Sequence, residues 1–264
     1  MQEKSVIQTV PISVSVVMIS RNEANNIAAC CESLKDFSEI ILVDNGSTDE
    51  TVKIAQSYSN VRVLLSEWKG YGGTRQIGVN AACHDWILWM DADERMTSDL
   101  QSEILSALAA ASSQTVFSIP RQNYFLGRRI YGCGWSPDRV TRVFNRTQTQ
   151  FDDKIVHEGL VSKSQRRDVS LNNRLTHYTY VSLQQFFEKN LRYALLAAEE
   201  RVRLERKVYF AGLLVRPLWE FFRSYVLKLG FLDGVHGIVI SGGSAIYVFC
   251  RDSQCLLQGR RLKN

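Results

Sequence analysis

The sequence predicts an α/β fold in which a mostly parallel sheet is flanked by helices and followed by a helical C-terminal extension. In the N-terminal half, short apolar runs alternate with segments of helical periodicity, and polar loops follow the runs. Strand, helix, strand repeated in this way is typical of βαβ units, whose strands pair in parallel. At 264 residues, the chain is long enough for one large α/β domain, or for a typical domain with a smaller appendage.

The expected elements of the first half follow one another at short intervals. Apolar runs predict strands over residues 12–19, 39–43, 61–65, 86–90 and 115–119. Helical periodicity predicts helices over residues 24–34, 49–58, 74–82 and 98–111. Residues 121–180 are irregular and rich in Arg, Asn, Gly and Asp, which favours short strands and long loops.

The C-terminal region is expected to be helical and to lie at a membrane interface. A long helical pattern over 182–206 opens with Ser182 and Gln185 at the spacing of a capping box. Residues 207–229 mix aromatic and basic side chains, typical of an interfacial helix, with a break or kink near Pro217. Residues 234–250 lack charge but contain four glycines, which indicates a packed or interfacial helix rather than a transmembrane one. Ordinary core packing is the alternative.

Charge and cysteine usage narrow the classes of partner and compartment. The net charge is +5, and from Arg201 onward 11 Lys or Arg stand against 4 Asp or Glu. Such a basic end suits an anionic lipid surface or acceptor, and a solvated basic face is the alternative. No recognised nucleic-acid module accompanies it, so nucleic acid is not an expected partner. The six cysteines lack metal-ligand spacing or a disulfide pattern, which favours reduced thiols in the cytoplasm. The apolar stretch over 10–19 is read as a first strand rather than a signal peptide.

The polar loops after the first four strands are expected to gather at one edge of the sheet, where α/β proteins bind ligands. These loops span residues 20–23, 44–49, 67–75 and 91–94. In the last loop, Asp91 and Asp93 can hold a hard divalent cation that also binds phosphate oxygens, a combination suited to Mg²⁺ or Mn²⁺. Such a cation would offset the charge on a departing nucleoside diphosphate. Solvated acidic turns and helix caps are the alternative for each loop.

The order of these motifs resembles family 2 glycosyltransferases over about the first 120 residues. The matching segments are residues 19–23, 43–49, 70–75 and 90–94. The resemblance implies the nucleotide-diphosphate-binding α/β fold called GT-A, a UDP-sugar donor, and inversion at the anomeric carbon. It implies a catalytic domain over 1–180, with a donor half at 10–120 and an acceptor half at 121–180, followed by the helical region 181–264.

The same resemblance implies the residues that bind the donor. Asn22 and Glu23 are implied beside the nucleoside and Asp44 beside its base. Arg75 is implied near the phosphates, and Asp91 and Asp93 at the ribose, phosphate and metal. The full expected donor-binding set is Ser20, Asn22, Glu23, Asp44, Gly46, Arg75, Asp91, Ala92 and Asp93.

A narrower similarity concerns the acceptor. Residues 67–72, 139–144, 156–158 and 231–234 resemble bacterial lipopolysaccharide core transferases that add β-1,4-glucose to an inner-core heptose. The resemblance implies UDP-glucose as donor, an anionic membrane-held acceptor, and a peripheral protein at the cytoplasmic face of the inner membrane. The alternatives are a polyprenyl phosphate or capsular glycan acceptor and, in another class, a non-catalytic, membrane-associated protein that binds sugar nucleotides.

Inversion needs a carboxylate that takes the proton from the acceptor hydroxyl. Many members of the family supply it from a Glu-Asp pair that this sequence lacks, so Glu158 is the candidate base, with Asp152 and Asp153 behind it. A structural ion pair is the alternative for Glu158, and His157 is read as either a substrate contact or a packed histidine.

Two arginines are expected to contact an anion. Arg139 and Arg142 alternate on a predicted strand and are therefore expected to face the same side. There they would bind the donor phosphate or the acceptor anion through forked hydrogen bonds.

Overall fold

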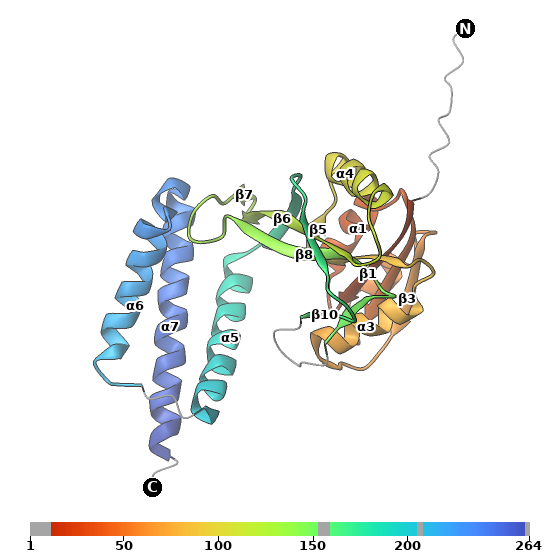
Figure 1. Cartoon of the computed structure of the whole chain (residues 1–264). Helices are drawn as coiled ribbons and strands as arrows, with labels where there is room; N and C mark the ends of the chain where they lie inside the picture. The colour runs from red at the N-terminus through yellow and green to blue at the C-terminus, as the bar shows by residue number, and fades with distance from the viewer. Residues whose placement is uncertain (1–11, 153–158, 205–207, 262–264) are drawn as a thin grey trace. The chain divides into compact units, whose positions relative to one another are not determined.

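The computed structural model describes residues 12–152, 159–204 and 208–261. The chain divides into two compact units (Figure 1). Unit 1 comprises Met1–Arg121 and Arg139–His177, and unit 2 comprises Gln122–Asp138 and Tyr178–Asn264. The segment 122–138 therefore belongs with the C-terminal helices.

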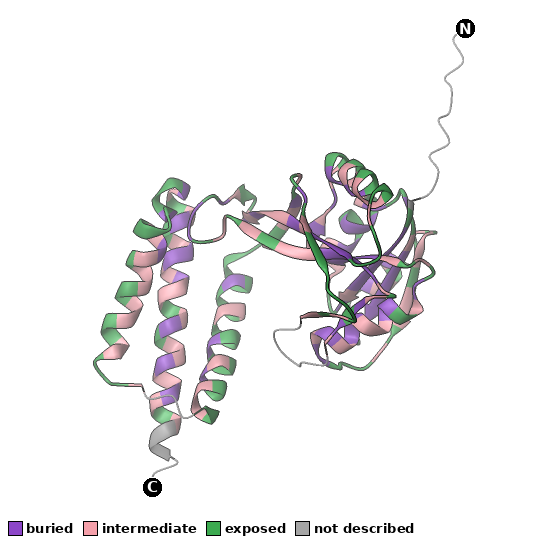
Figure 2. Cartoon of the chain, viewed as in Figure 1, coloured by how far each residue is buried: buried purple, intermediate pink, exposed green. Residues whose placement is uncertain are grey.

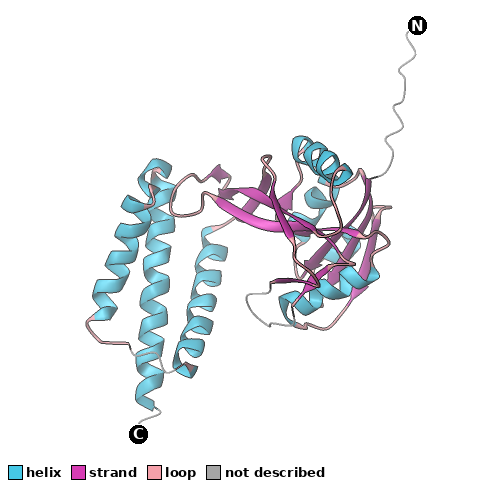
Figure 3. Ribbon diagram, viewed as in Figure 1, coloured by secondary structure: helices cyan, strands magenta, loops and turns pink. Residues whose placement is uncertain are grey.

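A mixed sheet forms the centre of unit 1, drawn in magenta in Figure 3. Its parallel part has the order β3-β2-β1-β4, with bounds Val61–Leu65, Phe37–Asp44, Ile12–Ser20 and Trp86–Asp91. The order continues through β8 (Asp138–Asn145), β6 (Thr115–Phe125), β12 (Leu175–Tyr180) and β5 (Glu94–Arg95). Pairing is antiparallel between β4 and β8 and between β12 and β5. The predicted α/β fold is confirmed, with its longest parallel run in the N-terminal half.

Four short strands complete the β-structure of the described residues. β7 (Arg128–Arg129) and β11 (Arg167–Ser170) pair with β6. β9 (Thr149–Phe151) and β10 (Leu160–Ser162) form a separate antiparallel pair. These strands lie within the region that the sequence predicted to be irregular.

Alternating side chains of the central strands build two apolar cores. Val16 and Met18 of β1 pack in the core that includes residues of α1 (Ala24–Ser33), α2 (Thr51–Ala55) and α4 (Ser98–Ala109). Val17, between them, packs in the other core, with residues of α3 (Gly70–Ala81). Strand side chains point alternately to opposite faces, so the sheet is covered on both sides. At Gly78 of α3 a Cβ atom would lie 2.6 Å from Val17 Cγ1, so glycine permits this close packing.

Two helices of unit 1 differ in length from the prediction. α2 is shorter than the expected 49–58, because the Asp49 side chain accepts hydrogen bonds from the Thr51 and Ala24 amides (3.0 and 3.1 Å) and so precedes the helix. α3 begins at Gly70, four residues before the expected start. Glycine disfavours a helix in isolation, but Gly70 and Gly72 are buried, and tertiary packing outweighs that preference.

Unit 2 is built on three helices, α5 (Leu183–Arg203), α6 (Gly212–Phe222) and α7 (Val235–Arg261), with α5 and α6 both packed on α7 (Figure 1). The predicted N-terminal cap of α5 is confirmed, because Ser182 Oγ accepts a hydrogen bond from the Gln185 amide at 3.1 Å. The Gln185 side chain in turn accepts from the Val181 amide, also at 3.1 Å. None of the helices in the described part of the chain combines the length and the apolar character needed to cross a bilayer.

Of the expected break or kink near Pro217, the break is wrong, because α6 continues through this residue; the kink stays a prediction. Proline removes a single backbone donor in the middle of the helix, and the α-helical geometry continues on either side. The departure from it comes later, in the π-helical turn Arg223–Leu227. A 3₁₀ turn, Gly230–Asp233, then leads to α7.

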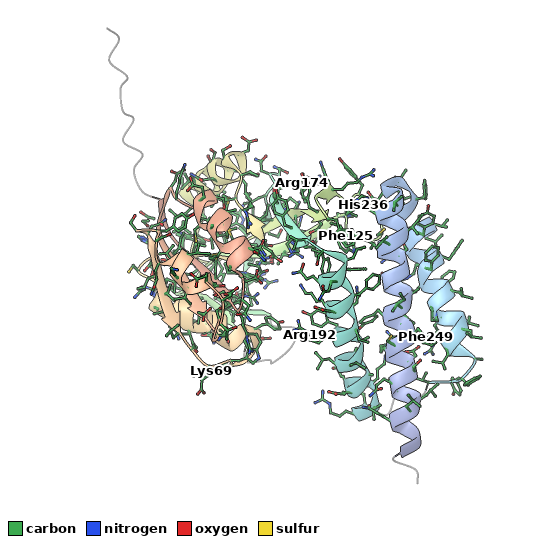
Figure 4. All side chains as sticks on the ribbon, turned by 180° about the vertical axis from the view of Figure 1, so that it is seen from behind. Lys69, Phe125, Arg174, Arg192, His236 and Phe249 are labelled. Carbon is green, nitrogen blue, oxygen red and sulfur yellow. The ribbon has the colours of Figure 1, made fainter. Side chains whose placement is uncertain are left out.

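An aromatic cluster and a buried aspartate hold the segment 122–138 in unit 2. Phe125 lies beside His236 of α7, with ring centroids 6.2 Å apart (Figure 4). Asp233 is fully buried and accepts hydrogen bonds from the amides of Tyr131 (3.0 Å) and Gly132 (2.7 Å). The charged acceptor explains the acidic residue in the 231–234 motif as a structural one.

Candidate active site

The carboxyl ends of β1, β2 and β4 bring the first polar loops to one edge of the sheet. Ser20 pairs in register with Asp44, and Ile19 pairs with Asp91. Three of the residues predicted to bind a donor therefore end on neighbouring strands. Parallel pairing places their loops on the same side of the sheet, as α/β ligand sites require.

The loops after β1 and β2 are joined by hydrogen bonds. Asn22 has a φ of 58°, a left-handed conformation that asparagine tolerates better than most residues. Its Oδ1 accepts from the Thr48 amide at 2.8 Å, and its own amide donates to Ser47 Oγ at 2.9 Å. The Glu23 amide donates to Thr51 Oγ1 at 2.7 Å. Asn22 and Glu23 therefore fix the entry to α1 against the β2–α2 loop.

Asp44 organises the turn that follows β2. It is 1% exposed, and its Oδ1 accepts from Ser20 Oγ at 2.9 Å. Its Oδ2 accepts from the amides of Gly46 (3.1 Å) and Ser47 (2.9 Å). Gly46 has a φ of 77°, which favours glycine at this position. The loop therefore forms the turn that was the alternative interpretation of its sequence, and this turn lies at the edge where donor binding was predicted.

Asp91 is held between two arginines. Its Oδ1 lies 2.8 Å from Arg75 Nη2 and its Oδ2 lies 3.0 Å from Arg142 Nη2. Burial alone would raise the pKa of Asp91, but the guanidinium groups of Arg142 and Arg75 outweigh it and hold this pKa well below its ordinary value. The ring of Trp89 supports both guanidinium groups, with centroid distances of 3.6 Å to Arg142 and 4.3 Å to Arg75. Asp91 is therefore an anion with a fixed geometry.

Glu94 is a second carboxylate of this cluster, to which the sequence prediction gave no role. Its side chain is 0% exposed and forms ion pairs with Arg142 and with Arg121, the latter at 3.3 Å. It also accepts a hydrogen bond from the Asp91 amide at 2.9 Å. In the sequence, only its position directly after the Asp-x-Asp triplet pointed to Glu94. That position alone does not distinguish a buried ion pair from a solvated turn.

The expectation that Arg139 and Arg142 share a face is wrong. Residues three apart on a strand point to opposite sides, because side-chain direction alternates with a period of two. Arg142 is fully buried between Asp91 and Glu94. Arg139 is exposed and donates from Nη1 to the carbonyl oxygens of Ser118 (3.0 Å) and Leu171 (2.8 Å).

Asp93 differs from Asp91 because one of its side-chain oxygens has no hydrogen-bond partner among the described residues, and we call this atom the open oxygen. Its Oδ1 is buried and has no hydrogen-bond partner among the described residues. Its Oδ2 lies 3.4 Å from Nε2 of His177, and the two side chains are 21% and 12% exposed. His177 reaches this position because β12 pairs with β5 and places it opposite Glu94. No local pattern in the sequence linked two residues so far apart in the chain.

The described residues offer few side-chain ligands for a cation. Within residues 12–152, 159–204 and 208–261, no group of three or more His, Cys, Asp or Glu side chains is arranged to hold a metal ion. Asp93 and His177 offer one carboxylate and one imidazole. Ala92, between the two aspartates, is buried, and its carbonyl oxygen accepts from Arg95 Nη1 at 2.8 Å.

Most residues predicted around the catalytic base fall outside the described ranges. Glu158, Asp153 and His157 lie there, so their roles stay predictions. Asp152 follows β9, and its Oδ1 accepts a hydrogen bond from the Gly159 amide at 3.0 Å. Asp152 and Gly159 are the described residues on either side of the candidate base in the sequence.

An open cavity of about 460 Å³ lies at the opposite edge of the sheet. Its lining includes Gln76, Asp85 and Arg146. Asp85 precedes β4 whereas Asp91 ends it, so this cavity is not formed by the strand-end loops. The chemistry of the site therefore rests on the loops and not on the cavity.

Comparison with known proteins adds an independent finding. The family model described as glycosyl transferase family 2 matches residues 15–170. The lipopolysaccharide core biosynthesis glycosyltransferase LpsC of Rhizobium meliloti is 29% identical over 249 residues, covering 90% of each chain. An uncharacterized glycosyltransferase of Rickettsia conorii is 27% identical, covering 90% of this chain and 86% of its own. The structure of S. aureus TarS 1–349 in complex with UDP covers 96% of this chain and 92% of its own, at 16% identity and a TM-score of 0.48.

Proposed function

Because the chain belongs to glycosyl transferase family 2, we propose that it moves a hexose from a UDP-sugar to an acceptor hydroxyl, with inversion at the anomeric carbon. The observation that carries the site assignment is the open Oδ1 of Asp93, beside His177 and next to the Asp91 ion pairs. A buried carboxylate oxygen without a donor costs free energy unless a ligand satisfies it. The strand-end position is where a nucleotide would be bound.

The cation of the proposed reaction is Mg²⁺ or Mn²⁺, held by Asp93 with His177 as a second ligand. A hard cation needs few protein ligands when phosphate oxygens and water complete its shell. Asp91 was expected beside Asp93 at this cation, but both its oxygens accept from guanidinium groups, so we assign it to placing Arg75 and Arg142. When bound, the cation offsets the negative charge of the departing UDP.

The remaining groups bind the donor and take the acceptor proton. Asp44, Asn22 and Glu23 hold the two loops that would carry the nucleoside. Glu158 is the proposed base, which accepts the hydroxyl proton as the acceptor oxygen attacks the anomeric carbon and the bond to UDP breaks. Asp152 and Asp153 are the alternatives, and His157 and Arg139 are proposed at the acceptor.

For the acceptor we propose an inner-core heptose of lipopolysaccharide, and for the sugar glucose, at the cytoplasmic face of the inner membrane. The name of the Rhizobium meliloti relative, a lipopolysaccharide core biosynthesis glycosyltransferase, supports this acceptor class. The basic character of unit 2 suits an anionic acceptor, since 15 Lys or Arg there stand against 8 Asp or Glu.

A transfer assay tests the proposal. The protein is incubated with a panel of UDP-sugars, Mg²⁺ or Mn²⁺, and lipopolysaccharide truncated to its inner-core heptoses. Product is identified by mass spectrometry and its anomeric configuration by NMR. We expect a β-linked hexose and strict need for the acceptor. Transfer only to polyprenyl phosphate or a capsular glycan would change the acceptor class, and UDP binding without any transfer would indicate a non-catalytic protein.

A further inference from the structure

Helix α6 of unit 2 exposes many of its apolar side chains. The exposed positions recur at intervals of three and four residues, the spacing of one helix face. We call this face the apolar stripe; it consists of Leu214 (69% exposed), Val215 (64%), Leu218 (72%), Trp219 (54%) and Phe222 (44%) of α6, with Val226 (40%) of the π-helical turn that follows. Figure 2 shows no buried residue in α6, whereas α7 carries several. A helix of a water-soluble domain normally buries such a stripe.

The other positions of α6 are partly buried and are both apolar and polar: Leu213, Pro217 and Phe221 alternate with Arg216 and Glu220. Arg216 Nη1 lies 3.1 Å from Oδ2 of Asp252, whose side chain is 0% exposed. The hydroxyl of Ser241 donates to the buried Ser224 Oγ at 3.0 Å, in the turn that follows α6. These polar contacts contribute to holding the segment against α7, while its most exposed positions carry apolar side chains, where water-soluble helices carry charged ones. An exposed apolar stripe of this kind suits an apolar environment outside the unit.

Positive charge lies beside the stripe. Asp252 is shared by three arginines from three helices, Arg201, Arg216 and Arg251, at 3.3, 3.1 and 2.8 Å. One carboxylate against three guanidinium groups leaves a local excess of two positive charges. Arg201 and Arg216 keep 27% and 41% of their side chains exposed, so this charge reaches the surface. An apolar face with adjacent cations matches the interfacial layer of an anionic bilayer.

We propose that the apolar stripe of α6 docks in the interfacial region of a bilayer rich in anionic lipid, with Tyr209 and Phe210 entering the same layer. These two residues immediately precede α6 and are 67% and 73% exposed. Aromatic side chains favour the boundary between headgroups and acyl chains. The helix lies in the plane of this boundary, consistent with the lack of a spanning helix in the described part of the chain. This inference rests on the membrane location in the proposed function and names the surface responsible.

Vesicle flotation of the full chain tests the proposal. The probes are vesicles of phosphatidylcholine alone and vesicles of phosphatidylglycerol mixed with phosphatidylcholine. The variant Leu218→Ser/Trp219→Ser removes the centre of the stripe without changing Arg216, which binds Asp252. The matched control is Leu65→Ser, at a 77% exposed leucine of β3 in unit 1. We expect wild type and control to float with anionic vesicles, the stripe variant to bind about tenfold less or weaker still, and binding to fall with added salt.

Three outcomes would overturn the proposal. The stripe variant could float as well as wild type, or wild type could ignore anionic vesicles. In the third, size-exclusion chromatography could show a wild-type dimer that the variant abolishes, with flotation unchanged, which would make the stripe a self-association surface. Transfer to a soluble heptose acceptor is measured in parallel. Lost flotation with retained transfer separates this surface from the reaction, whereas absent transfer with normal flotation contradicts only the proposed function.

Discussion

Unit 1 and unit 2 each bury a carboxylate among arginines, but the two clusters balance their charge differently. In unit 1, the buried Glu94 shares an arginine, Arg142, with a second carboxylate, the partly exposed Asp91. In unit 2, Asp252 alone faces three arginines from three helices. The first cluster fixes groups at the edge of a sheet and leaves an open oxygen on its neighbour Asp93. The second joins three helices and keeps a positive excess. Similar ion pairs therefore lie at the proposed reaction site in one unit and beside the proposed docking surface in the other.

The largest effect is expected at the centre of the unit 1 cluster. Arg142→Met removes the cation shared by Asp91 and Glu94 and leaves the fully buried Glu94 without this partner, which should lower the free energy of unfolding by about 3–5 kcal/mol. Arg166→Met is the control, because Arg166 pairs with Asp168 at the surface, where side chains are 39% and 62% exposed. Its cost should stay below about 1 kcal/mol. Urea denaturation measures both, and equal losses would show that the buried cluster contributes no more than a surface pair.

The next largest effect is expected at the open oxygen of Asp93, where a substitution should change the reaction rate and not the stability. Asp93→Ala should lower the rate of UDP release by about a hundredfold or more, which corresponds to roughly 3 kcal/mol. The fold should be retained, because the Asp91 ion pairs do not involve this side chain. Asp99→Ala, at an exposed aspartate in the first turn of α4, is the matched control. Undiminished turnover in the Asp93 variant would remove it from the proposed cation site.

The contrast between these two aspartates also separates what the sequence predicted from what it could not. Apolar runs predicted β3 at its observed bounds, and the parallel pattern predicted that Ser20, Asp44 and Asp91 would gather at one edge. These inferences need only the local periodicity and the rule that the carboxyl ends of parallel strands lie at the same edge of a sheet. The same reasoning named Asp91 and Asp93 together, without distinguishing the paired carboxylate from the open one.

The missing parts depend on antiparallel pairings between distant segments. Glu94 meets Arg142 because β8 lies beside β4, and Asp93 meets His177 because β12 pairs with β5. Neither pairing has a turn signal or a periodicity that joins the two segments. The misplacement of Arg139 had a different cause, a wrong count of the strand period, which the sequence alone was sufficient to correct.

The smallest of these effects is expected in unit 2 and depends on pH. Burial alone would raise the pKa of Asp252, but hydrogen bonds from Arg251 and Arg216 and the positive charges of Arg251 and Arg201 outweigh it and lower this pKa. A carboxyl whose pKa is lower in the folded state stabilises the fold above its unfolded pKa, about 4, and loses this contribution as pH falls through the folded value. Asp252→Asn should therefore cost about 1–3 kcal/mol near neutrality, because three guanidinium groups lose their shared anion.

Thermal unfolding of wild type and the Asn variant across this pH range measures that difference. We expect the gap in Tm to start narrowing as the pH falls below about 4, where the carboxyl of the unfolded chain takes up a proton, and to close only as the pH falls through the lower pKa of Asp252 in the folded protein. The matched control is Asp168→Asn, at a 62% exposed carboxylate in unit 1, whose effect should be small at every pH. A gap for Asp252→Asn that stayed constant with pH would mean that packing, and not charge, is what the carboxylate contributes. In that case the charge of Asp252 would not be what holds the three arginines beside the apolar stripe. The proposed electrostatic difference between the two clusters would then be contradicted.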